Sequence, residues 1–164
     1  MFPLIRKKVL FLPGWFSDGG TKAAFMRSLG YDVRTPRLSD WFFRRAVVQA
    51  QRAFEDMKPD VIVGASRGGG VAMDLDSGDT PMILMAPAWR RWCRNRRCKS
   101  GTVIIHSIRD ECVPFGDSLE LCRGNIEVPL IATGEDHRLN DSEARSALAS
   151  ALCLVLADNP KPSS

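Results

Sequence analysis

The sequence predicts an α/β fold, a three-layer sandwich in which a mainly parallel sheet of about six strands lies between two layers of helices. Two observations lead to this prediction. Apolar runs of strand length alternate with longer amphipathic segments along most of the chain, which is the pattern of βαβ units. Several loops that carry a serine, an acid or a histidine also begin directly after an apolar run.

The predicted strands are the short apolar runs. Residues 9–12 lead into a glycine-rich loop, residues 59–63 lead into Gly64, and residues 102–106 lead into a loop with acidic side chains. Each run is short and ends at turn-forming residues, as strands do. The full set of predicted strands lies near 8–12, 31–35, 60–64, 82–86, 102–106 and 128–132.

The predicted helices occupy the longer segments between the strands, near 21–29, 41–57, 67–76, 116–123 and 141–156. In the last of these, apolar residues recur at helical spacing, namely Ala144, Leu148, Leu152 and Val155. The connection 86–101 has helix-compatible residues but a poor apolar stripe. We therefore expect it to be a short surface excursion over the edge of the sheet.

The size of the chain predicts one domain. With 164 residues, 45% of them hydrophobic, the chain is long enough for one buried core and too short for two ordinary domains. We assign the domain to residues 1–157. The polar tail, 158–164, contains prolines and serines and is expected to be disordered.

The composition argues against several classes of protein. No apolar run is long enough to cross a membrane, and the charges near the N-terminus follow the first apolar residues, the reverse of a secretory signal. We therefore expect a soluble cytoplasmic protein. The 5 cysteines lack the spacing of a zinc site, so we predict free thiols, no metal and no cofactor.

The charge balance is mildly basic. The chain has 23 Lys and Arg against 19 Asp and Glu, which makes nucleic acid an unlikely partner. One segment departs from this balance, because it combines six basic residues with two tryptophans. They are Trp89, Arg90, Arg91, Trp92, Arg94, Arg96, Arg97 and Lys99.

The most informative motif is the sequence Gly-Ala-Ser-Arg-Gly at residues 64–68. It follows a predicted strand and opens a helix of small residues. In a G-x-S-x-G elbow the serine lies on a tight strand-to-helix turn, and the glycines leave room for its hydroxyl to project into a cleft. This context predicts that Ser66 is a nucleophile.

A serine hydroxyl needs a base within hydrogen-bonding reach to attack at neutral pH. The chain has 2 histidines. His137 follows the last predicted strand in a loop rich in glycine and acidic residues, so we predict that it is the base for Ser66. His106 lies in or at the end of a predicted core strand, where a buried, hydrogen-bonded structural role is favoured over catalysis.

The predicted acid is Asp110, because the loop directly after the fifth predicted strand can place its carboxylate behind the imidazole of His137. Asp136 is the nearest alternative. Adjacent residues rarely point together, however, so a loop-capping role for Asp136 is favoured. Glu111 and Asp117 are interpreted as solvated or helix-capping.

With these residues in place, the chain resembles a small α/β-hydrolase, over about residues 9–156. The matching segments are Pro-Gly-Trp at 13–15, the elbow at 64–68, Asp110 with Val-Pro at 113–114, and Asp-His at 136–137. Serine, acid and histidine also occur in the order of that family's triad. The resemblance implies an oxyanion hole made by the backbone N–H groups of Trp15 and Arg67, with Gly14 allowing close approach of a substrate.

Three features depart from the family pattern. The chain starts at the strand that precedes the oxyanion loop, without the usual opening pair of antiparallel strands, and the excursion 86–101 replaces a helical cap. Pro13-Gly14 also stands where His-Gly is common.

A glycine-rich loop after the first strand could instead hold a phosphate, but G-x-G-x-x-G is absent, so nucleotide binding is disfavoured.

The resemblance implies a serine hydrolase with the triad Ser66, Asp110 and His137, acting on a small ester, thioester or related acyl bond through an acyl-enzyme. If Trp89, Pro87 and the arginines overhang the cleft, Arg90 or Arg91 could attract an anionic substrate by charge and the tryptophans could contact it by stacking, with Trp89 and Arg90 as the selected contacts. The alternative for this segment is a solvated loop. The alternative for the whole protein is a non-catalytic ligand-binding or scaffold protein on the same fold.

Overall fold

A single parallel sheet organises the chain, whose computed structural model describes residues 6–17, 19–124 and 127–157. The strand order is β2-β1-β3-β4-β5-β6, and every pairing is parallel. The strands are β1 (Lys8–Leu12), β2 (Asp32–Arg34), β3 (Val61–Ala65), β4 (Met82–Met85), β5 (Thr102–His106) and β6 (Leu130–Ala132). The helices are α1 (Gly20–Ser28), α2 (Phe43–Met57), α3 (Arg67–Met73), α4 (Trp89–Trp92), α5 (Phe115–Arg123) and α6 (Ser142–Ala157).

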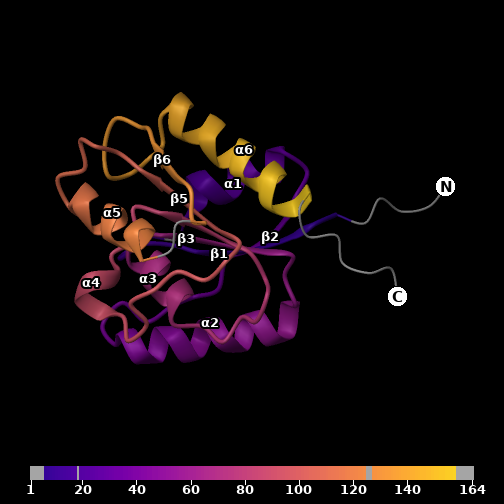
Figure 1. The fold of residues 1–164 in the computed structure, drawn as a ribbon. Coiled ribbons are helices and arrows are strands. Elements are labelled where there is room, and N and C mark those ends of the chain that lie inside the picture. The colour runs from indigo at the N-terminus through magenta and orange to yellow at the C-terminus, as the bar shows by residue number, and fades with distance from the viewer. Residues whose placement is uncertain (1–5, 18, 125–126, 158–164) are drawn as a thin grey trace.

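Helices cover both faces of the sheet, so the predicted three-layer α/β class is confirmed (Figure 1). Alternation along β1 shows how the layers form. Leu10 and Leu12 pack with α2 and α3, whereas Val9 and Phe11 pack with α1 and α6. Successive side chains of a strand point to opposite faces, so a strand between two helical layers is apolar throughout.

The strand order reverses beside β1, and this reversal positions the candidate site. The chain leaves β1 for β2 on one side and returns to β3 on the other. Leu12, the last residue of β1, lies opposite Gly64 in β3. Loops that leave neighbouring strands in opposite directions open a crevice at the carboxyl edge of the sheet, where ligands of such folds bind.

Two glycines allow α3 to pack directly against the sheet. A Cβ atom on Gly68 would lie 2.1 Å from the carbonyl oxygen of Leu12, and one on Gly64 would lie 2.7 Å from the carbonyl oxygen of Gly68. Both contacts are with backbone, which cannot move aside cheaply. The motif glycines therefore serve the packing of strand against helix as well as the turn itself.

The main difference from the sequence prediction lies in the connection 86–101. It contains α4, a single helical turn at Trp89–Trp92, which was not predicted because four residues are too few to show an apolar stripe. Trp89 is 2% exposed and anchors the turn in the core.

Other differences are small. Both edge strands are shorter than predicted, and α3 ends at Met73 rather than near 76. Strand β6 has 3 residues, none of them fully buried, and it pairs with β5. The tail 158–164, expected to be disordered, lies outside the described residues. Among the helices within the described ranges, none combines the length and apolar character needed to cross a membrane.

Candidate active site

Ser66 occupies the turn between β3 and α3. Its backbone angles, φ 52° and ψ −120°, lie where a non-glycine residue is strained. Hydrogen bonds on both sides hold it there: its N–H donates to the Met85 carbonyl at 2.8 Å, and its own carbonyl accepts from the N–H of Ala88 at 2.9 Å. The local structure is thus the strained strand-to-helix turn that the G-x-S-x-G motif predicts.

His137 reaches Ser66 from the loop after β6. The Ser66 hydroxyl lies 2.9 Å from Nε2 of His137 and can donate its proton there. The loop is shaped by Asp136, whose Oδ1 accepts the N–H groups of Arg138 and Leu139 at 2.9 and 3.2 Å. Asp136 therefore has the loop-capping geometry favoured from the sequence, and its carboxylate is not the one that contacts the imidazole.

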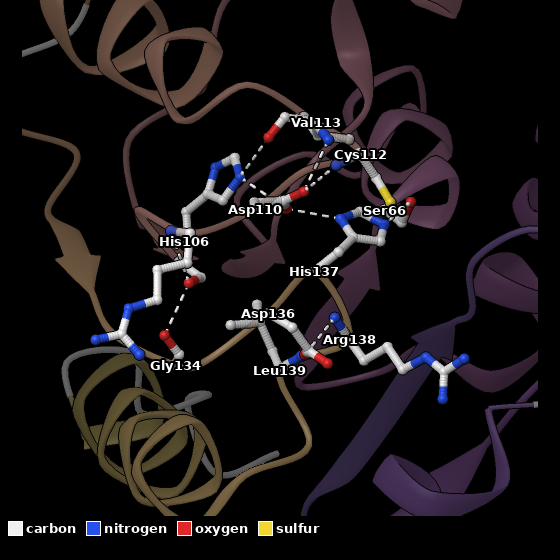
Figure 2. A network of polar contacts seen from close by, with 12 residues as sticks. Ser66, His106, Asp110, Cys112, Val113, Gly134, Asp136, His137, Arg138 and Leu139 are labelled. Atoms are coloured by element: carbon white, nitrogen blue, oxygen red, sulfur yellow. Dashed lines mark hydrogen bonds and ion pairs between the residues drawn. The ribbon is translucent and has the colours of Figure 1, made fainter.

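Asp110 holds the other side of the imidazole. Its Oδ2 lies 2.6 Å from Nδ1 of His137, and its Oδ1 accepts the N–H groups of Cys112 and Val113, each at 2.8 Å (Figure 2). Burial alone would raise the pKa of this carboxyl. The hydrogen bonds from Val113, His137 and Cys112 outweigh it, so the pKa lies below the ordinary Asp value, and Asp110 is ionised at neutral pH.

A second imidazole shares this carboxylate. His106 has no exposed side-chain surface, and its Nε2 lies 3.0 Å from Asp110 Oδ2 and 3.1 Å from the carbonyl oxygen of Val113. Because a carbonyl can only accept, Nε2 carries a proton. Nδ1 then accepts from the hydroxyl of Ser118 at 2.7 Å. Burial lowers the pKa of His106 despite the nearby charge of Asp110, which favours this neutral tautomer.

The candidate oxyanion donors lie beside the serine. Arg67 is the first residue of α3, so its N–H has no acceptor within the helix. Gly14 packs so closely that a Cβ atom there would lie 3.3 Å from Ser66 Cβ, and Trp15 follows it in the loop after β1. Gly14, Trp15, Ser66, Arg67 and His137 all line one cavity of about 1000 Å³.

The structure places the other two predicted substrate contacts differently. Trp89 does not line the cavity, because its ring is buried and its Nε1–H donates to the Asp117 carbonyl at 3.1 Å. Arg90 does line it, but its guanidinium forms ion pairs with Asp117 and Glu120. Sequence reasoning thus selected a buried tryptophan, since it could not show which side of a single helical turn faces the cavity.

Two further residues lie at the site, and one of them, Cys112, was not selected from the sequence. Trp92 lines the cavity; it belongs to the basic segment whose tryptophans were considered for an anionic substrate, although Trp89 was the one selected. Cys112 also lines the cavity, and its Sγ lies within 4.8 Å of a carboxylate oxygen of Asp110 and of a ring nitrogen of His137. Asp110 and His137 are already hydrogen-bonded to one another, so we propose no metal role for these three side chains.

No family model matches the sequence, and no curated protein matches it at a significant level. Solved structures match the fold. Alpha/beta hydrolase domain-containing protein 10 from mouse has a TM-score of 0.76 and 14% identity, covering 92% of this chain and 90% of that one.

Two further structures agree. A protein of Agrobacterium vitis S4, named provisionally as a hydrolase, gives a TM-score of 0.75 at 20% identity, with 92% and 88% covered. Est1E from Butyrivibrio proteoclasticus gives 0.73 at 13% identity, with 96% and 90% covered. The chain therefore has the α/β-hydrolase fold, as the sequence resemblance predicted. Fold alone does not define chemistry, so function must be argued from the site.

Proposed function

We propose that this protein is a serine hydrolase that cleaves a small ester, thioester or related acyl bond through an acyl-enzyme on Ser66. The observation that carries the proposal is the hydrogen-bonded series from Ser66 through His137 to Asp110, with distances of 2.9 and 2.6 Å. An ionised, buried acid behind a histidine that contacts a serine is the arrangement needed to activate a hydroxyl.

In the first half-reaction, the Ser66 oxygen bonds to the substrate carbonyl carbon while Nε2 of His137 takes the hydroxyl proton. The charge on the carbonyl oxygen is stabilised by the N–H groups of Trp15 and Arg67. The bond to the leaving oxygen or sulfur then breaks, and His137 returns its proton to the departing group. Asp110 keeps the imidazole oriented and stabilises its charged form.

In the second half-reaction, a water molecule attacks the acyl-enzyme while His137 takes its proton. The ester bond to Ser66 breaks, the serine regains its hydrogen, and the carboxylic acid leaves. One water is consumed for each acid and alcohol, or acid and thiol, released. Every proton moves through the single Nε2 atom that faces Ser66.

Small acyl groups fit this proposal best. The connection between β4 and β5 contains only the single turn α4, so the described part of the chain places no helical cap over the site that could enclose a long chain. We expect 4-nitrophenyl acetate and butyrate to be hydrolysed faster than the palmitate ester. Faster turnover of palmitate would contradict this assignment.

The test is labelling with a small fluorophosphonate, followed by intact-mass measurement. We expect one adduct on the native protein, none on Ser66→Ala, and labelling slowed by at least about 100-fold in His137→Ala. Ser17→Ala is the matched control, because Ser17 lines the same cavity and its loss should leave labelling intact. No adduct on folded native protein would reject the proposal in favour of a ligand-binding protein.

A further inference from the structure

The helical turn α4 divides its four residues between two tasks. Trp89 is buried, and Arg90 is paired with Asp117 and Glu120 of α5. These two residues attach the turn to the core and to the neighbouring helix. The next two residues, Arg91 and Trp92, line the cavity that contains Ser66.

Arg91 offers a positive charge to the cavity. Its guanidinium lies 4.8 Å from the centre of the Trp92 ring, and among the described residues no acidic group forms an ion pair with it. Stacking on an aromatic ring holds a guanidinium in place without using its N–H donors. Those donors are therefore available to an anion in the cavity.

An aromatic wall connects this charge to the serine. Trp92 meets Trp15 edge to face with 5.8 Å between ring centres, and Trp15 stacks on Phe16 at 5.5 Å. Trp15 is 42% exposed and directly follows Gly14, where an added Cβ atom would lie 3.3 Å from Ser66 Cβ. A flat apolar group bound at Ser66 can therefore lie along Trp15 and Trp92 and end at Arg91.

The remaining charges of the cavity lining also favour an anion. Among the described residues of the lining the acidic one is Asp117, which is paired with Arg90. Lys22 lines the cavity and donates to the carbonyl of Arg138 and to Asn140. Burial lowers the pKa of Lys22 to about 8 against the opposing effect of Asp136 and Asp141, so it retains much of its charge at neutral pH. The Arg138 side chain extends away from His137 (Figure 2).

We propose that the substrate is an ester or thioester with a flat apolar group that ends in an anionic group, held by Trp92 and Arg91 respectively. The inference rests on the proposed function for the ester bond, since Ser66 is taken as the acylated atom. Arg91 and Trp92 take the place of Trp89, which is buried, and of Arg90, whose guanidinium is paired with Asp117 and Glu120. Arg91 and Trp92 are specificity residues here, remote from the bond that is cleaved.

Binding can be tested without turnover, using Ser66→Ala protein and calorimetric titration with 6-hydroxy-2-naphthoate and its uncharged primary amide. We expect the carboxylate to bind about fivefold tighter or more at low salt, with the difference shrinking as salt is added. Arg91→Gln should remove the preference. Arg97→Gln removes an equal charge from an exposed site outside the cavity and should keep it, and Trp92→Ala should weaken both ligands.

Equal binding of the two compounds, or a preference that survives Arg91→Gln, would overturn the inference. The 6-acetoxy esters of the same two compounds then test catalysis with the native protein, and we expect Arg91→Gln to lower kcat/KM for the charged ester alone. Failure of the proposed function gives a separate result: no fluorophosphonate adduct and no ester hydrolysis, whatever the binding preference.

Discussion

His106 and Asp110 meet through the same carboxylate oxygen that His137 contacts: Oδ2 of Asp110 lies 3.0 Å from Nε2 of His106 and 2.6 Å from Nδ1 of His137. The other oxygen is held by two backbone N–H groups. Apart from His137 itself, the donors around the carboxylate are therefore two backbone groups and one buried ring. Its plane cannot rotate without breaking at least one of these bonds.

Replacing His106 by Ala is expected to lower the rate of Ser66 labelling by about 10- to 100-fold, because Asp110 loses a fixed donor and His137 loses its orientation. His106→Gln supplies an amide donor and should recover part of this loss. The measurement is fluorophosphonate labelling across pH, made beside the free energy of unfolding. A labelling rate that falls only as far as folded protein is lost would show a purely structural role.

The stability of the fold should decrease on acidification through His106. In the folded state the pKa of His106 lies below its ordinary value of 6.5. Below pH 6.5 the unfolded chain therefore binds more protons than the folded chain, and the free energy of unfolding decreases as the pH falls toward the folded-state pKa. Asp110 and His137 are the titratable groups that face His106. The pKa of Asp110 is also lowered in the folded state, so its carboxylate stabilises the fold above pH 3.8, the ordinary pKa of an aspartate. This contribution is lost as the pH falls further, toward the folded-state pKa.

We therefore expect urea unfolding between pH 7.5 and pH 5 to show a smaller loss of stability in His106→Gln than in the native protein. The window lies above the titration of Asp110, so the difference reports the imidazole. Identical pH dependence in the two proteins would contradict the buried neutral state of His106.

Gly68→Ala is expected to destabilise the fold by about 3 kcal/mol, since the added Cβ would lie 2.1 Å from the carbonyl oxygen of Leu12. Gly116→Ala is the matched control. It lies in helix α5 with nothing within 4 Å of the added atom, so it should stabilise by about 0.5 to 1 kcal/mol. Denaturant unfolding measures both, and similar effects of the two changes would refute the close packing of α3.

Thiol reactivity should separate the cysteines. Burial raises the pKa of Cys93 and of Cys98 to about 12, so neither should react with iodoacetamide in folded protein. Cys112 is exposed beside the triad, and its alkylation should slow Ser66 labelling by occupying the cavity. Cys112→Ala should make labelling insensitive to iodoacetamide. Equal sensitivity with and without Cys112 would place the inhibitory thiol elsewhere, with the exposed Cys153 the first to examine.

Most of the fold could be predicted from the sequence because the central strands are nearly continuous apolar runs. The residues proposed as nucleophile, base and acid also lie together, since each lies in the turn or loop that follows a strand and parallel strands end at one edge of the sheet. The bond from His106 to Asp110 could not be predicted, because it depends on which way the ring turns at the end of β5. Which of Trp89 and Trp92 faces the cavity depends in the same way on how a single helical turn is oriented, and this could not be predicted either.

Ser66 and His137, the proposed nucleophile and base, are anchored very differently. Ser66 leaves β3, which is paired on both sides, whereas His137 follows β6, a three-residue strand at the margin of the sheet that pairs with β5. Peripheral strands open at lower free energy than central ones. Local opening at this margin would move His137 away from Ser66 while the rest of the sheet stays folded, so that the proposed catalytic arrangement can be lost without global unfolding.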